Sequence, residues 1–185
     1  MSKGKLFIIS GASGVGKSTV LKRVMEKRPD IRFSVSATTR DPRPNEEHGV
    51  HYFFVTKEVF EDMIAKDAFL EYDNHNAHYY GTPIGQLEER LALGHTILDI
   101  EPVGAAIARR KRRDATLIFI TPPTMEELER RLRGRGDTSE EQIAIRLERA
   151  KWEMDQRRWY DYEVVNDVVE TCAEEILNII AREAD

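Results

Sequence analysis

Glycines, a lysine and a hydroxyl group near the N-terminus follow a spacing that suits phosphate binding. The segment reads Gly11-Ala12-Ser13-Gly14-Val15-Gly16-Lys17-Ser18-Thr19 and, up to Ser18, fits the pattern G-x-x-x-x-G-K-S/T. The glycines let successive backbone N–H groups face a phosphate, and Lys17 brings a mobile cation to the β- and γ-phosphates. The pattern predicts a nucleoside triphosphate, with Mg²⁺ on the Ser18 hydroxyl. The alternative is a glycine-rich turn that only joins a strand to a helix.

A second group of candidate phosphate ligands lies in a proline-rich loop. The residues at every third position there are Arg40, Arg43, Glu46, Gly49 and Tyr52. Prolines and a glycine among them argue against a regular helix or strand. Guanidinium groups match the oxygens of a phosphate monoester, and a phenol adds a neutral donor. We expect a second anion site, which Tyr80 could close; the alternative is a solvated charged loop.

Apolar runs and amphipathic segments supply the scaffold for these groups. Residues 5–10, 96–100 and 115–120 lack polar alternation, as expected of strands covered on both faces, and residues 164–165 add one more strand. A helix follows Gly16, and another carries an apolar stripe formed by Cys172, Ile176, Leu177, Ile179 and Ile180. Strands that alternate with helices predict an α/β fold with a parallel sheet.

Asp99 closes the apolar run at residues 96–100. A carboxylate at the end of such a strand can orient Mg²⁺ directly or through water. We therefore assign Asp99 to the metal site, and we also count it among the residues of the second anion site. The alternative is an ordinary aspartate at a strand end.

Two segments interrupt the rhythm of strands and helices. Residues 33–89 contain turn-forming prolines and short aromatic strands, and residues 126–158 are strongly charged. We expect both to be inserts, the first a lobe with short strands of its own. The core domain would then comprise residues 1–32, 90–125 and 159–185.

Composition narrows the class of protein. The chain has 185 residues, a formal net charge of −5 and the single cysteine Cys172. An acidic chain lacks the basic field that favours nucleic acids or anionic membranes, and residues 109–113 are interpreted as a basic helix end. One cysteine excludes an internal disulfide, and no apolar run approaches the ~18 residues that span a bilayer. We expect a cytoplasmic protein without nucleic-acid or membrane partners.

Taken together, these motifs resemble the guanylate kinase family. The resemblance covers nearly the whole chain, including the phosphate loop, the Arg40-to-Tyr52 string and shorter matches at residues 69–72, 79–82, 97–100, 133–136 and 165–167. It implies a P-loop NTPase-type parallel sheet flanked by helices, with an inserted nucleoside-monophosphate lobe and a lid. It also implies transfer of the γ-phosphoryl group of ATP to GMP, and to dGMP, with Mg²⁺.

The resemblance also assigns roles to individual residues. It implies that the GMP phosphate is held by Arg40, Arg43, Tyr52 and Tyr80, and that guanine is contacted by Ser36, Glu71 and Thr82. Asn166 matches a family residue near the adenine nucleoside. Arg135 and Arg146 match lid arginines that swing over the transferring group. The catalytic set is then Lys17, Arg40, Arg135 and Arg146.

A physical argument supports Glu71 independently. Guanine presents N1–H and a 2-amino group as adjacent donors, which one carboxylate can accept together. Adenine has an acceptor at N1 and no 2-amino group. A polar site left without its partners can cost several powers of ten in selectivity.

The chain departs from the family pattern after Asp99. The family commonly has a second aspartate and a glutamine there, whereas this chain reads Glu101-Pro102-Val103-Gly104.

Two other functions stay open. One is a kinase for another phosphorylated sugar or nucleotide on the same scaffold. The other is the inert guanylate-kinase-like module of membrane scaffolds, which has a damaged phosphate loop.

Overall fold

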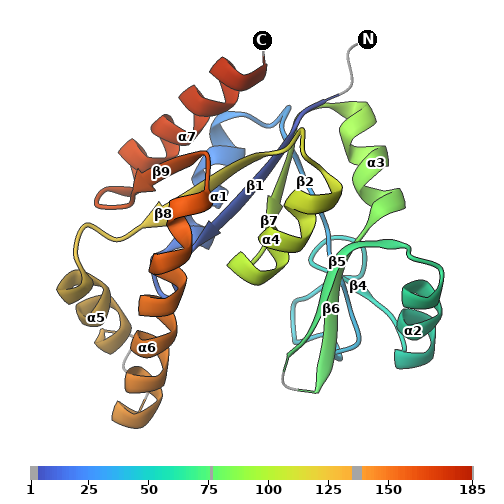
Figure 1. Ribbon diagram of the computed structural model, residues 1–185, viewed down its shortest axis with the longest axis horizontal. Helices are drawn as coiled ribbons and strands as arrows, with labels where there is room; N and C mark the ends of the chain where they lie inside the picture. The colour runs from blue at the N-terminus through green and yellow to red at the C-terminus, as the bar shows by residue number, and fades with distance from the viewer. Residues whose placement is uncertain (1–3, 76, 135–138, 185) are drawn as a thin grey trace. The chain divides into compact units, whose positions relative to one another are not determined.

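The computed structural model describes residues 4–75, 77–134 and 139–184, whose strands and helices are drawn in Figure 1. The strands are β1 Leu6–Gly11, β2 Arg32–Phe33, β3 Ala37–Thr38, β4 Phe53–Phe54, β5 Phe69–His75, β6 His78–Pro83, β7 Thr96–Asp99, β8 Thr116–Thr121 and β9 Tyr162–Val165. The helices are α1 Lys17–Lys27, α2 Lys57–Ala65, α3 Ile84–Leu93, α4 Pro102–Lys111, α5 Met125–Arg133, α6 Glu140–Gln156 and α7 Val169–Ala184, with a short 3-10 helix η1 Arg157–Trp159.

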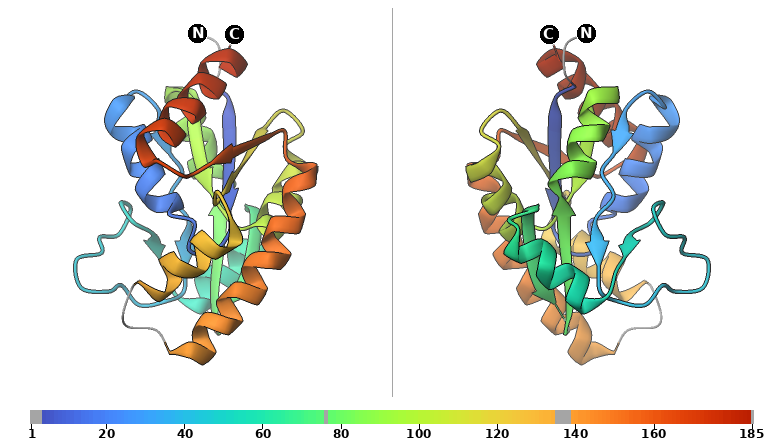
Figure 2. Two further views of the ribbon diagram at one scale, coloured as in Figure 1. Left: turned by 90° about the vertical axis from the view of Figure 1, so that its left-hand side faces the viewer. Right: turned by 90° about the vertical axis from the view of Figure 1, so that its right-hand side faces the viewer.

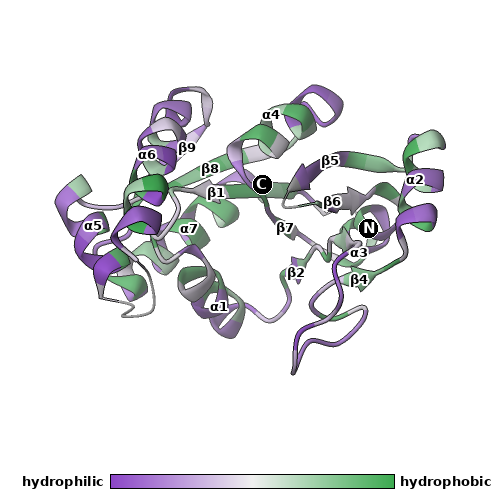
Figure 3. Ribbon diagram, turned by 90° about the horizontal axis from the view of Figure 1, so that it is seen from below, coloured by the Kyte–Doolittle hydropathy of each residue, from purple (hydrophilic) through white to green (hydrophobic). Residues whose placement is uncertain are grey.

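The parallel sheet has the strand order β2-β7-β1-β8-β9. β1 pairs with β8 from Phe7–Thr116 to Gly11–Ile120, and β9 pairs with the other edge of β8. Every residue of β1 and β8 is buried, and Figure 3 shows both strands as largely hydrophobic. Strands covered on both faces show no polar alternation. The predicted α/β fold with a parallel sheet is therefore confirmed, and the short strand predicted at residues 164–165 belongs to β9.

A second sheet of four strands, in the order β4-β3-β6-β5, forms within residues 33–89. β6 pairs antiparallel with both β3 and β5. Phe60 of α2 stacks on Phe69, with 4.3 Å between ring centroids, and on Tyr79, with 5.1 Å. Together with Ala37, the rings form a small hydrophobic core that fixes α2 on this sheet.

The chain divides into two compact units, each assembled from separate stretches of sequence. The first comprises residues 30–99 and 103–115 with the N-terminal stretch up to Leu6, and contains the four-stranded sheet, β2, β7, α2, α3 and most of α4. The second comprises residues 7–29, 100–102 and 116 onward, and contains most of β1, β8, β9, α1, α5, α6 and α7. Within it, α7 packs against α1 (Figure 2).

Helix α7 confirms the predicted apolar stripe. Cys172, Ile176, Ile179 and Ile180 are buried, and Leu177 is half-buried. Burial raises the pKa of the Cys172 thiol to about 12, so this cysteine stays protonated and acts as a core residue. Across the described residues, we find no helix with both the length and the apolar character that crossing a membrane requires.

The basic run at residues 109–113 ends α4 and finds its partners within the chain. Lys111 donates to the backbone oxygen of Phe69 at 2.9 Å and pairs with Asp67 at 2.9 Å. Arg112 pairs with Glu88 at 2.7 Å. These contacts, together with the dipole of α4, support the interpretation of the run as a basic helix end.

Replacing Phe60 by alanine tests the small core of the four-stranded sheet. Phe60→Ala removes a fully buried ring and is expected to lower the free energy of unfolding by about 3–5 kcal/mol, measured by urea denaturation. Val59→Ala on the same helix is the control, because Val59 is 47% exposed and its loss should change stability by no more than about 0.5 kcal/mol. Equal effects of the two substitutions would contradict the assignment of this core.

Candidate nucleotide-binding sites

The phosphate loop adopts a conformation that only glycine accepts at two positions. Gly14 and Gly16 have φ angles of 88° and 91°. A Cβ on Gly14 would lie 2.5 Å from the side chain of Leu132, and one on Gly16 would lie 2.9 Å from Nδ2 of Asn166. Both the backbone angle and the close neighbours therefore require glycine.

The loop opens onto the start of α1. Gly16 caps the helix without a side-chain hydrogen bond, and the first turn carries no acidic residue. The N–H groups at a helix start carry partial positive charge, so this end of α1 suits an anion. The next residues are the half-buried Lys17 and the exposed Ser18 and Thr19. The loop begins with the buried Gly11 and Ala12, followed by the half-buried Ser13.

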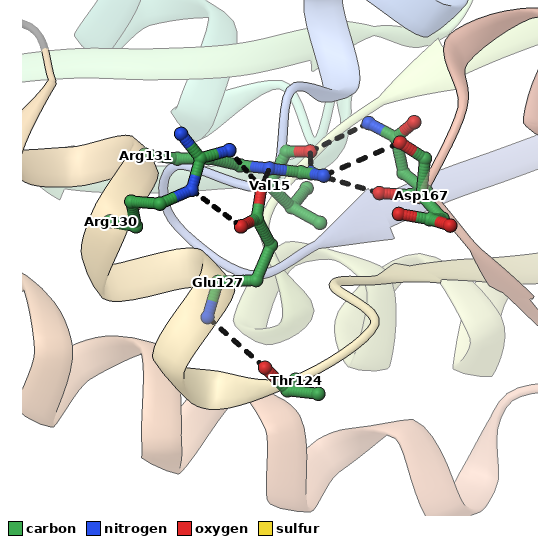
Figure 4. A network of polar contacts seen from close by, with 7 residues as sticks. Val15, Thr124, Glu127, Arg130, Arg131 and Asp167 are labelled. Carbon is green, nitrogen blue, oxygen red and sulfur yellow. Dashed lines mark hydrogen bonds and ion pairs between the residues drawn. The ribbon is translucent and has the colours of Figure 1, made fainter.

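The carbonyl oxygen of Val15 is held from outside the loop (Figure 4). It accepts from Nδ2 of Asn166 at 2.7 Å and from Nη1 of Arg131 at 3.4 Å. Arg131 also donates to the backbone oxygen of Asn166 at 2.8 Å, while the Asn166 N–H donates to Thr121 at the end of β8 at 2.8 Å. Asn166 is 2% exposed and its Oδ1 is buried, without a partner among the described residues. Asn166 and Arg131 thus fix the outer side of the loop.

Helix α5 orients Arg131 through Glu127. The Glu127 carboxylate accepts from Arg130 at 2.7 Å and from Nε of Arg131 at 2.7 Å. These two bonds hold the pKa of Glu127 at about 2, so it stays ionised. The Glu127 N–H donates to Thr124, which caps the helix at 3.1 Å.

Glu153 of α6 is a buried carboxylate next to the same loop. It is 3% exposed and accepts from the Ser13 backbone N–H at 2.7 Å. Arg149, one turn earlier, donates its Nε to the other carboxylate oxygen at 3.0 Å. Arg149 also forms an ion pair with Glu101. The residue that departs from the family pattern after Asp99 therefore contacts α6.

In the other unit, Glu46 orients Arg40. Two parallel bonds of 2.9 and 3.0 Å join the guanidinium to the Glu46 carboxylate, which also accepts from the Arg43 backbone N–H at 2.8 Å. These contacts, with Arg40 as the largest contributor, hold the pKa of Glu46 at about 2. The pair remains charged at neutral pH and presents Arg40 in one fixed orientation.

Two tyrosines accompany Arg40. Its guanidinium carbon lies 5.5 Å from the ring centroid of Tyr52. The hydrogen bond with Glu46 is the main cause of the raised Arg40 pKa, and a hydrogen bond with Tyr80 adds to it. The two tyrosine rings meet edge to face at 6.1 Å. Burial, with a smaller contribution from Tyr80, raises the pKa of Tyr52, so its phenol remains a neutral donor. Arg43 lies exposed on the loop.

Glu71 and Thr82 lie together on the hairpin β5–β6. Glu71 is 7% exposed and accepts from the Thr82 hydroxyl at 2.5 Å. Burial raises the pKa of Glu71, and the Thr82 bonds only partly offset that shift. Gly104 of α4 packs on the carboxylate so closely that a Cβ there would lie 2.9 Å from its Oε2.

Ser36 and Asp99 belong to the same unit as this pair. Ser36 precedes β3, and the antiparallel pair Ala37–Gly81 extrapolates to place Ser36 opposite Thr82. Asp99 ends β7 and is partly exposed. Its negative charge contributes to the raised pKa of Tyr52, which links it to the Arg40–tyrosine group.

The predicted site residues fall into the two units. The phosphate loop and Asn166 belong to one unit, whereas Arg40, Glu71 and their neighbours belong to the other. Arg146 is half-buried on α6, and Arg135 lies outside the described residues. Sequence reasoning did not foresee the supporting contacts of Arg131, Glu153 and Glu46. Only Glu46 carried a signal, since it follows Arg40 across a proline-rich turn with the opposite charge.

Comparison with known proteins matches nearly the whole chain to guanylate kinases. The family model described as "Guanylate kinase" matches residues 3–183. A guanylate kinase of Thermus thermophilus is 46% identical over 182 residues, which cover 98% of this chain and 82% of that protein. A guanylate kinase of Escherichia coli is 46% identical over 186 residues, covering 99% of this chain and 90% of its own.

Solved structures give the same result. The guanylate kinase from Anaplasma phagocytophilum superposes with a TM-score of 0.77 at 32% identity, covering 99% of this chain and 87% of its own. A gluconokinase from Sinorhizobium meliloti superposes with a TM-score of 0.54 at 16% identity, covering 98% of this chain and 94% of its own, which shows a shared fold alone.

The raised pKa of Glu71 predicts that its charge opposes folding. A carboxyl whose pKa is higher in the folded than in the unfolded protein lowers stability at pH values above its folded-state pKa. It has no such effect at pH values below its unfolded-state pKa. Glu71→Gln should therefore raise the melting temperature of the ligand-free protein at pH 7.5, and the gain should shrink as the pH falls through the Glu71 pKa. Glu89→Gln, the same change at an exposed glutamate of α3 in the same unit, is the control. A lower melting temperature for Glu71→Gln at pH 7.5 would refute the prediction.

Proposed function

The chain belongs to the guanylate kinase family, and from this premise we propose that it transfers the γ-phosphoryl group of ATP to GMP, giving ADP and GDP, and that it also accepts dGMP. The reaction belongs to purine nucleotide metabolism. The observation that carries the proposal is the buried Glu71–Thr82 pair, in the unit that also presents Arg40 with two tyrosines. Residues suited to contact a base and residues suited to bind a phosphate in one unit fit a nucleoside monophosphate.

Each group of residues has a separate task. The loop from Gly11 to Thr19 holds the ATP phosphates, with Lys17 neutralising charge on the β- and γ-phosphates and Asn166 near the adenine nucleoside. Arg40, Arg43, Tyr52 and Tyr80 hold the GMP phosphate. That phosphate is already an ionised nucleophile, so alignment and electrostatic stabilisation can carry the reaction without a general base. Arg135 and Arg146 would stabilise the charge on the transferring group.

Mg²⁺ fits the donor set that the chain offers. Mg²⁺ prefers oxygen ligands and in kinases takes one or two from the protein, the rest being phosphates and water. The exposed Ser18 hydroxyl and the strand-end carboxylate of Asp99 are such ligands, and the described residues hold no cluster of three His, Cys, Asp or Glu that would form a closed protein cage. When bound, Mg²⁺ neutralises charge on the β- and γ-phosphates.

Glu71 makes the site selective for guanine over adenine. Its carboxylate accepts N1–H and the 2-amino group of guanine, and ligand donors compensate a charge that burial disfavours. Thr82 keeps one carboxylate oxygen oriented, and Ser36 adds a further polar contact. Adenine would place an acceptor against this carboxylate and would leave it unpaired.

The assignment of lobes follows from these roles. We assign residues 33–89 to GMP binding, residues 126–158 to the lid, and residues 1–32, 90–125 and 159–185 to the core. A cytoplasmic setting, where ATP and GMP are substrates and thiols stay reduced, fits the single buried Cys172.

Two other functions are less well supported. A kinase for another phosphorylated sugar or nucleotide has no use for a buried carboxylate at Glu71. An inert guanylate-kinase-like module would not need the glycine conformations at Gly14 and Gly16 or the lysine that follows them.

A substrate survey tests the proposed function. ADP release should be measured with GMP, dGMP, AMP, CMP and UMP as acceptors, with ATP and Mg²⁺ saturating. We expect GMP to exceed AMP in kcat/KM by at least about 100-fold, because adenine leaves Glu71 unpaired. Comparable turnover of AMP would sink the guanine assignment. Lys17→Met should lower kcat by about 100-fold or more and serves as the background control.

Gly104→Ala tests the space around Glu71. The new Cβ would lie 2.9 Å from Oε2 of Glu71, so the carboxylate would have to move from its present position. We expect the Kd of GMP, measured by calorimetry, to rise about tenfold, the loss of one charged hydrogen bond, while ATP binding stays unchanged. Gly85→Ala is the matched helix control, because nothing lies within 4 Å of a Cβ there. An unchanged Kd for GMP in Gly104→Ala would contradict the proposed guanine pocket.

A further inference from the structure

We propose that Glu153 is a positioning residue, which holds the phosphate loop in its binding conformation, with Arg149 as its counter-ion. The inference rests on the proposed function, since it concerns the binding of ATP by that loop. It gives α6 a second task besides carrying Arg146.

The position of Glu153 is unusual for a glutamate on a long charged helix. Its side chain is 3% exposed, whereas Glu148 on the same helix is 75% exposed. A buried carboxylate is costly unless charged partners and hydrogen bonds compensate it. Both oxygens of Glu153 are in fact used, one by the Ser13 backbone N–H at 2.7 Å and one by Nε of Arg149 at 3.0 Å.

The bond to Ser13 acts on the loop at a defined point. Ser13 is the residue before Gly14, where the backbone turns to a positive φ. The Ser13 N–H, which donates to Glu153, and the Val15 N–H, which donates to the Ala12 oxygen at 3.0 Å, fix the backbone on either side of Gly14. Asn166 and Arg131 hold the loop at Val15, and Glu153 holds it two residues earlier.

Arg149 and Glu101 complete the arrangement. Arg149 lies one helical turn before Glu153 and balances its charge, so the loop does not face an uncompensated anion. Glu101 binds the same guanidinium, although this outer pair is largely exposed and contributes little on its own. The order of contacts is therefore Ser13, Glu153, Arg149 and Glu101, all within one unit.

The experiment measures Mg-ATP and GMP binding separately, by calorimetry, in the full-length protein. Glu153→Ala leaves the Ser13 N–H without its acceptor and is expected to raise the Kd of Mg-ATP about tenfold, the range for a charged hydrogen bond. The Kd of GMP should change less than about twofold, because GMP binds through the other unit. Glu153→Gln keeps an oxygen in the same place and should recover most of the Mg-ATP affinity.

Further variants separate positioning from plain structural support. Glu148→Ala removes the same charge from an exposed site on the same helix and should leave both Kd values unchanged. Arg149→Met should weaken Mg-ATP binding in the wild-type background but not in Glu153→Ala, because the two residues act through one contact. Amide hydrogen exchange at Ser13 should speed up in Glu153→Ala without ligand.

Three results would overturn the proposal. The first is an unchanged Kd of Mg-ATP in Glu153→Ala. The second is a loss of GMP affinity and of melting temperature in Glu153→Ala that parallels its loss of Mg-ATP affinity. The third is failure of Glu153→Gln to recover Mg-ATP binding. None of them bears on the acceptor, because the substrate survey of the wild type tests GMP phosphorylation independently. A wild type that binds Mg-ATP but does not phosphorylate GMP would refute the proposed function and leave the Glu153 measurements interpretable.

Discussion

Backbone N–H groups can grip a phosphate only if they already point toward it, and most features of the second unit follow from that constraint. The loop after β1 cannot hold such a conformation alone, because Gly14 and Gly16 are the residues with the largest conformational freedom. Support comes from outside, through Asn166 and Arg131 at the Val15 carbonyl and Glu153 at the Ser13 N–H. Each supporting group is itself oriented by a partner, so the loop is preorganised at low conformational cost.

The first unit, which we propose binds GMP, holds two charged groups in fixed surroundings. Arg40 is kept charged and fixed by Glu46 and lies against the Tyr52 ring, which suits a permanently anionic phosphate. Glu71 is kept buried with one hydroxyl partner, at a cost to its ionised form. Under the proposed function, the first arrangement would favour binding of any phosphate monoester, and the second would make binding depend on the donors of the base.

Sequence was sufficient for the parts of the molecule whose pattern is local. The apolar runs predicted β1, β7 and β8, because strands buried on both faces show no polar alternation. The apolar stripe predicted α7, because a helix buried on one side carries apolar residues at helical spacing. The pattern G-x-x-x-x-G-K-S could be recognised because it lies within consecutive residues, and its binding of phosphate stays a prediction. Glu153 and Arg131 were not readable, since their partners lie 140 and 116 residues away and nothing in a charged helix marks which charge is buried.

The order in which these contacts can form has a consequence for synthesis of the chain. The loop is among the first segments to leave the ribosome, yet β1 pairs with β8 only once Thr116 has been made, and the groups that hold the loop sit at residues 131, 153 and 166. Neither unit is a continuous stretch that could mature alone. Long-range pairing of this kind is slow and leaves apolar strands exposed meanwhile. The nascent chain therefore carries an unfinished nucleotide site for most of its translation, and a truncated product that ends before Asn166 should lack a formed phosphate loop.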